Sequence, residues 1–140
     1  MRSKAPLALM EQLVMILVFA LAAALCLQAF ALSQQVAKKN EQRDQAMLQA
    51  QNVAEAVKGC AGDYEQVAAL WGGEWNGRTW SRFVDAHWQS TEEGGVYQIS
   101  VVPGISGLSL LETADITVTS AEGTCLAQLS VAWQKVVAHE

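Results

Sequence analysis

The sequence predicts an α+β protein in which one long N-terminal helix packs on a small antiparallel sheet of three to four strands. Residues 7–57 contain neither proline nor glycine and are dominated by good helix formers. The C-terminal half instead holds short segments of alternating polarity, rich in β-branched and aromatic residues and separated by turn signals. A chain of 140 residues is long enough for one membrane anchor and one small domain.

The long helix is expected over residues 7–58 and has two different halves. Residues 13–32 are almost wholly apolar, with Gln28 as the one strongly polar member. About 20 apolar residues span a bilayer as a helix, so this segment is a transmembrane candidate. Gly59 and Gly62 predict where the helix stops. In the second half, apolar residues recur at three- and four-residue spacing, which predicts a stripe that packs on another element: Val36, Met47, Ala50, Ala54 and Val57.

Residues 59–140 are expected to form a small α+β head. A short helix is predicted over residues 63–71, with Asp63 as its N-cap. The gap before the last strand is short enough for a hairpin, and Pro103-Gly104 is read as part of an earlier turn. The predicted strands are residues 79–84, 96–102, 114–119 and 125–133.

Five tryptophans fall in this head, which leaves two interpretations open. An exposed tryptophan cluster can bind a glycan or a membrane surface, whereas in a small domain such residues more often supply the core. We favour the core. Trp80 and Trp133 are expected to be buried on strands, and Trp75 is expected to be the most exposed.

Composition argues against a nucleic-acid partner. The net charge is −5, and nine lysines and arginines are spread along the chain without a basic patch. Contacts to phosphates need clustered positive charge. We therefore expect no nucleic-acid binding.

No motif indicates catalysis, a cofactor or a metal site. His87 and His139 are far apart and lack the spacing of metal ligands. Asp85, Glu92 and Glu93 are read as a solvated loop rather than a cation site. No nucleophile and base stand in a recognisable arrangement, so the chain is expected not to be an enzyme.

The three cysteines divide by location. Cys26 lies in the apolar segment and acts there as a small apolar side chain. Cys60 and Cys125 lie in the head and could form one disulfide if the head is outside the cell. The alternative is two reduced, half-buried thiols, because sequence separation does not show proximity.

Glu11 is the most informative single residue. It stands between the apolar stretches APLALM and LVMILVF, and a carboxylate inside a bilayer costs roughly 2.5 to 3.5 kcal/mol. The alternative is an interfacial Glu11 before a membrane helix that begins at Leu13. The stretch KAPLALMEQLVMILVFALAAALCLQAF resembles the N-terminus of type IV pilins and pseudopilins, with a basic leader, a Glu at the fifth mature position and a long apolar helix.

The resemblance implies how such a chain would be processed and assembled. Residues 1–6 would be the leader, and a prepilin peptidase would cut between Pro6 and Leu7, although the family usually has Gly where Pro6 stands. The freed amine of Leu7 would lie near Glu11 of a neighbouring subunit. Other pilin-like subunits would be the partners through the N-terminal helix, and the chain would be a minor pilin or pseudopilin-like subunit of a type IV pilus, competence or type II secretion-like filament.

Two other functions compete with this one. Ala29-Phe30-Ala31 has the form of a signal peptidase site, so the chain could be a secreted protein cut after Ala31. A bitopic scaffold of the cell-division type would also combine a membrane helix with a helical extension, although the stripe after Val36 is too broken for sustained heptads.

Localisation follows from the anchor and the resemblance together. The lipid bilayer is the expected environment of residues 13–32, in a single-pass arrangement. Positive charges flank both ends of the segment in nearly equal number, so charge does not fix its orientation. The resemblance places the head outside the cytoplasm, in a surface filament or at the membrane.

Overall fold

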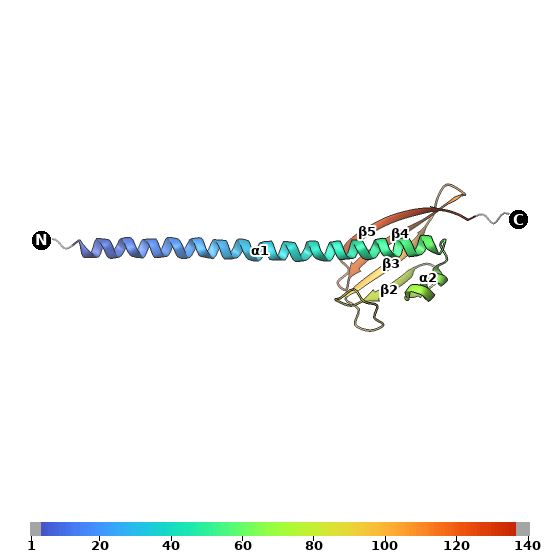
Figure 1. The fold of residues 1–140 in the computed structure, drawn as a ribbon, viewed down its shortest axis with the longest axis horizontal. Coiled ribbons are helices and arrows are strands. Elements are labelled where there is room, and N and C mark those ends of the chain that lie inside the picture. The colour runs from blue at the N-terminus through green and yellow to red at the C-terminus, as the bar shows by residue number, and fades with distance from the viewer. Residues whose placement is uncertain (1–3, 137–140) are drawn as a thin grey trace. The chain divides into compact units, whose positions relative to one another are not determined.

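In the computed structural model, which describes residues 4–136, the chain has the predicted α+β fold (Figure 1). Helix α1 spans Ala5–Gly59 and helix α2 spans Tyr64–Trp71, and both match the helices expected from the sequence. A five-stranded sheet follows. Its strands are β1 (Glu74–Trp75), β2 (Trp80–Val84), β3 (Tyr97–Gly104), β4 (Leu111–Ser120) and β5 (Cys125–Gln134).

The sheet is an antiparallel meander in the order β1-β2-β3-β4-β5. Strands β2 to β5 correspond to the four predicted segments, and β4 and β5 form the expected hairpin. The prediction of three to four strands is wrong by one. The extra strand, β1, has only two residues, and a segment that short cannot show the alternation by which a strand is recognised.

Strand β3 runs further than its sequence suggested. Pro103 was expected in a turn, but it pairs with Ala114 of β4 and lies inside the strand. Strand β2 covers β3 only as far as Val101, so Pro103 has a ladder partner on one side alone. A proline is tolerated at such an edge because no donor is needed on the open side.

The chain divides into two compact units, residues 1–40 and residues 41–140. The hydrophobic core belongs to the second unit and lies between α2, one face of the sheet and the last four turns of α1. Ala50, Ala54 and Val57 of the predicted stripe are buried there, whereas Met47 is exposed. On the sheet, the core face is the alternate residues of each strand, above all Trp80, Val84, Tyr97, Ile99, Val101, Ala114, Ile116 and Val118.

A glycine shapes the connection between α1 and α2. Gly62 has φ +78°, a conformation that favours glycine. A Cβ atom on Gly62 would lie 2.8 Å from Oε2 of Glu112 and 2.9 Å from the indole of Trp133. The next residue, Asp63, caps α2 as predicted, because its side chain accepts a hydrogen bond from the Gln66 amide at 3.1 Å.

Candidate functional site

The first half of α1 is a continuous apolar surface. Helix α1 contains a window near the N-terminus that is long and apolar enough to cross a membrane, and none of that window is buried within the chain. Leu13, Ile16 and Phe19 each leave more than half of their surface exposed. Apolar surface on this scale needs a cover from outside the chain, either lipid or other helices.

Glu11 lies on this surface, one turn from Leu7 and one turn from Met15 in α1. Its side chain is exposed. Within residues 4–136 the one ion pair is Lys135–Glu112 at 3.8 Å, so Glu11 forms no ion pair with any of these residues. A carboxylate in an apolar surface is therefore available to a cation of another molecule.

The residues expected at the cleavage site lie in the first turn of α1. The helix begins at Ala5, and the Ala8 amide bonds to the Lys4 carbonyl at 3.2 Å. Pro6 is tolerated there because the first turn of a helix does not use its amide hydrogens. Leu7 is exposed. Residues 1–3 of the predicted leader lie outside the described residues.

Cys60 and Cys125 are free thiols, so the structure does not contain the disulfide considered from the sequence. Cys60 precedes Gly62, which lies against Trp133 near the end of β5, whereas Cys125 begins that strand. Eight residues of strand separate Cys125 from Trp133, about 26 Å at 3.3 Å per residue. A disulfide needs Cα atoms within about 7 Å, so the two thiols are at opposite ends of the sheet and out of reach.

Four of the five tryptophans belong to the core or pack against it, whereas Trp71 is exposed. Trp80 is fully buried, as expected, and Trp133 is half-buried and donates its indole hydrogen to Glu112 at 3.1 Å. The expectation that Trp75 is exposed is wrong, because its ring stacks on Tyr64 with centroids 4.5 Å apart. Trp88 stacks on Tyr97 at 4.1 Å. The first pair joins β1 to α2, and the second joins a loop residue to β3. Because the partners belong to different elements, no local sequence pattern predicts these contacts.

The loop from Asp85 to Ser90 is organised by its own carboxylate. Asp85 accepts hydrogen bonds from the amides of Gln89 at 3.0 Å and His87 at 2.8 Å. The bond from Gln89, with a smaller contribution from His87, lowers the pKa of Asp85. Among residues 4–136 no three His, Cys, Asp or Glu side chains are placed to hold a metal ion. His139 lies outside the described residues.

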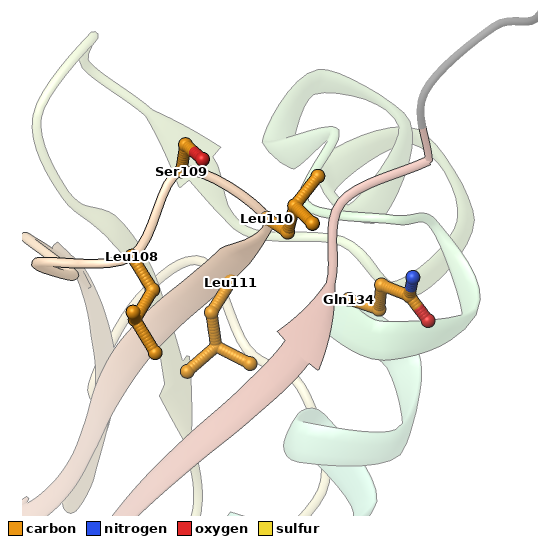
Figure 2. Close-up of a pocket in the computed structure, with 5 residues that line it drawn as sticks. All are labelled: Leu108, Ser109, Leu110, Leu111 and Gln134. Carbon is orange, nitrogen blue, oxygen red and sulfur yellow. The ribbon is translucent and has the colours of Figure 1, made fainter.

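An exposed apolar loop, residues 105–110, joins β3 to β4 and was not singled out from the sequence. Ile105 is fully exposed. The end of the loop and the end of β5 line an open pocket, formed by Leu108, Ser109, Leu110, Leu111 and Gln134 (Figure 2). The loop is braced, because Ser106 donates to the Leu108 carbonyl at 3.0 Å and the Lys135 amide donates to Leu110 at 2.9 Å.

Charge is divided unequally along the chain. Residues 1–40 contain four lysines and arginines against one acidic residue, whereas residues 41–140 contain five against thirteen. The negative charge is therefore concentrated in residues 41–140.

Comparison of the chain with protein-family models, curated proteins and solved structures finds no match. The functional proposal therefore depends on the residues and their geometry.

Proposed function

We propose that this chain is a structural subunit, of the minor pilin or pseudopilin kind, in a type IV pilus, competence or type II secretion-like filament. The observation that carries the proposal is the composition of α1. Its first half presents an uncovered apolar surface that contains Glu11, and its last turns pack on a small antiparallel sheet. This combination suits a subunit whose helix is buried among neighbouring helices while its head stays in water.

Glu11 gives such an assembly its register. In a bundle of apolar helices the effective dielectric constant is low, so an unpaired carboxylate is costly and a nearby amine is strongly attracted. If a prepilin peptidase cuts after Pro6, the new amine of Leu7 supplies that charge to a neighbouring subunit. The pairing stabilises one axial offset between helices and disfavours the others.

The membrane and the head have separate parts in this proposal. Before assembly the lipid bilayer covers residues 13–32, and in the filament other pilin-like subunits replace the lipid. The head is extracytoplasmic and carries the subunit's outer surface. No cofactor, metal or nucleic acid takes part.

Substitution of Glu11 tests the proposal. Glu11→Gln keeps the shape and removes the charge, and Glu11→Ala removes the whole carboxylate. Both variants should stay in the membrane fraction and disappear from sheared filaments or from pull-downs with other pilin-like subunits. Glu55→Gln, which neutralises an exposed carboxylate further along α1, is the matched control and should assemble normally. Assembly of both Glu11 variants at wild-type level would contradict the proposal and show that Glu11 is an ordinary interfacial carboxylate.

The two competing functions make different demands on the same residue. In a cleaved signal peptide Glu11 impedes export, so its removal should increase secretion. In a plain bitopic anchor Glu11 is nearly neutral, and its removal should change little. Pro6→Gly is tested alongside, with the expectation that it increases cleavage before Leu7 where a prepilin peptidase is present.

A further inference from the structure

Gln28 is the one strongly polar side chain in the apolar segment of α1, residues 13–32. It is exposed, and among residues 4–136 its side chain makes no hydrogen bond. Side chains of a helix lean toward its N-terminus, so the Gln28 amide leans toward the middle of the segment and away from the nearer end at Leu32. Lipid tails offer neither donor nor acceptor, and an amide without a partner is costly there. Gln28 therefore needs a hydrogen-bonding partner from another molecule.

Gln28 also borders a hollow on the surface of α1. The hollow measures about 320 Å³ and is lined by Gln28, Ala31, Leu32 and Gln35. The last three stand three, four and seven residues after the first, the spacing of neighbours on one side of a helix. Where two helices pair, each contacting side chain inserts into a hole formed by four residues of the facing helix. Because Ala31 has a short side chain, the hollow has room for a side chain of a second helix.

The side of α1 that carries Gln28 has the seven-residue repeat of paired helices. Each residue turns about 100° from the one before it, so positions seven apart lie only about 20° from each other. Two rows lie side by side: Val14, Leu21, Gln28 and Gln35 in one, and Leu17, Ala24 and Ala31 in the other. The rows alternate at spacings of three and four residues, the pattern of a coiled-coil contact. Since the other sides of the segment are apolar as well, it is Gln28 that selects this side.

We infer that the Gln28 side of α1 binds the same side of a second, parallel copy of this chain in the membrane, where the two Gln28 amides hydrogen-bond each other. An amide is both donor and acceptor, so two copies satisfy each other. In a parallel pair equivalent rows face each other, and Ala31 of one copy occupies the hollow of its partner. A single polar side chain at such a contact fixes the register of the pair.

A second copy fits this side better than lipid does. A copy that enters the bilayer in the same direction brings an amide to the same depth, whereas lipid tails bring none. The inference rests on the membrane span of the proposed function and names a partner, a second copy, for this helix. It does not depend on Glu11, which lies about 100° around the helix from Gln28.

Disulfide cross-linking in vesicles tests which side of α1 forms the contact. The full chain is reconstituted into phosphatidylcholine vesicles, so a second copy is the one protein partner present, and thiols are oxidised with copper phenanthroline. Cys60→Ser and Cys125→Ser remove the thiols of the head from every sample.

The native Cys26 supplies the matched control, because it lies about 160° around the helix from Gln28. In a Cys26→Ala chain, Ala24→Cys and Ala31→Cys each place a thiol on the side of the contact instead. A disulfide needs Cα atoms within about 7 Å, so each placed cysteine should give about fivefold more linked dimer than Cys26 does.

Substitution of Gln28 tests the hydrogen bond itself. Gln28→Leu keeps the size of the side chain and removes its amide, so linked dimer through Ala31→Cys should fall about tenfold. Gln28→Asn keeps an amide and should retain at least about half of the linked dimer. Gln34→Leu removes an exposed glutamine about 120° around the helix from Gln28 and should leave the amount of linked dimer unchanged.

The outcomes separate the inference from the proposed function. Equal cross-linking through Cys26 and Ala31→Cys, or no effect of Gln28→Leu, overturns the inference. So does a cross-link that forms only in native membranes and to a partner of another mass. If Glu11→Gln is lost from filaments but no cross-link depends on Gln28, the inference falls and the proposed function stands. If the cross-link depends on Gln28 while both Glu11 variants assemble normally, the inference stands and the proposed function falls.

Discussion

Tyr64 shows how much one polar atom depends on contacts that are distant in sequence. Its ring is buried against Trp75, and its hydroxyl has no hydrogen-bond partner among residues 4–136. Burial, and then the negative charge of Glu112, raises the pKa of Tyr64 from 10.0 to about 12. Sequence indicated neither the stack nor the approach of Glu112.

This environment predicts a specific pH dependence of stability. Between pH 10 and pH 12 the unfolded phenol ionises while the folded phenol keeps its proton, so the unfolded state is favoured and stability falls as pH rises. Tyr64→Phe should remove this component, and near pH 7 it should change stability by less than about 1 kcal/mol because no hydrogen bond is lost. Urea unfolding of the full chain in detergent, followed by tryptophan fluorescence, measures the pH dependence of stability and the effect of the substitution near pH 7. If the difference in free energy of unfolding between wild type and Tyr64→Phe stayed the same from pH 8 to pH 12, the raised pKa of Tyr64 would be contradicted.

Local signals at single residues were reliable where the structure needed only near neighbours. Asp63 was recognised as a cap because a cap bonds to an amide three residues away. Gly62 was recognised as a stop, but not as the point where the chain meets Glu112 and Trp133. The pairing of Cys60 with Cys125 could not be judged, because the distance between two cysteines is set by the whole sheet and not by their spacing in the chain.

At the scale of elements, the periodic segments were predicted and the short ones were not. The segments of β3, β4 and β5 alternate in polarity, so they could be recognised as strands from the sequence. The two residues of β1 carry no period. The stripe of α1 was found in part, since Ala46 and Val53 complete it, whereas the predicted members Val36 and Met47 are exposed.

The buried side chains of this stripe are mostly small, and they share one core with the residues of the sheet. Ala50 is fully buried, so Ala50→Leu should overpack the interface and destabilise the head by about 1–3 kcal/mol. Gln51→Leu adds an apolar side chain at the next, exposed position and should change stability by less than about 0.5 kcal/mol. Urea midpoints from tryptophan fluorescence report the comparison, because all five tryptophans lie in residues 71–133. Equal midpoints for the two variants would mean that Ala50 does not face the sheet.

For the whole molecule, the core predicts that the head folds without its apolar segment. Every residue of the buried cluster belongs to residues 41–140. A chain that begins at Ala37 should therefore be soluble, monomeric and folded, with circular dichroism of mixed helix and strand and a cooperative unfolding transition. A disordered spectrum from this chain would show that the fold depends on the preceding helix.

The central claim is that α1 from Leu7 onward remains attached to the head and that a free amine at Leu7 meets Glu11 of a neighbour. The intact mass of the protein extracted from membranes tests it most directly, because each function leaves a different N-terminus. We predict the mass of a chain whose first residue is Leu7. The mass of a chain that begins at Leu32 would contradict the claim, since signal peptidase would have removed the apolar segment with Glu11. The mass of a chain that begins at Met1 would also contradict it, because Leu7 would then have no free amine and α1 would be a plain anchor.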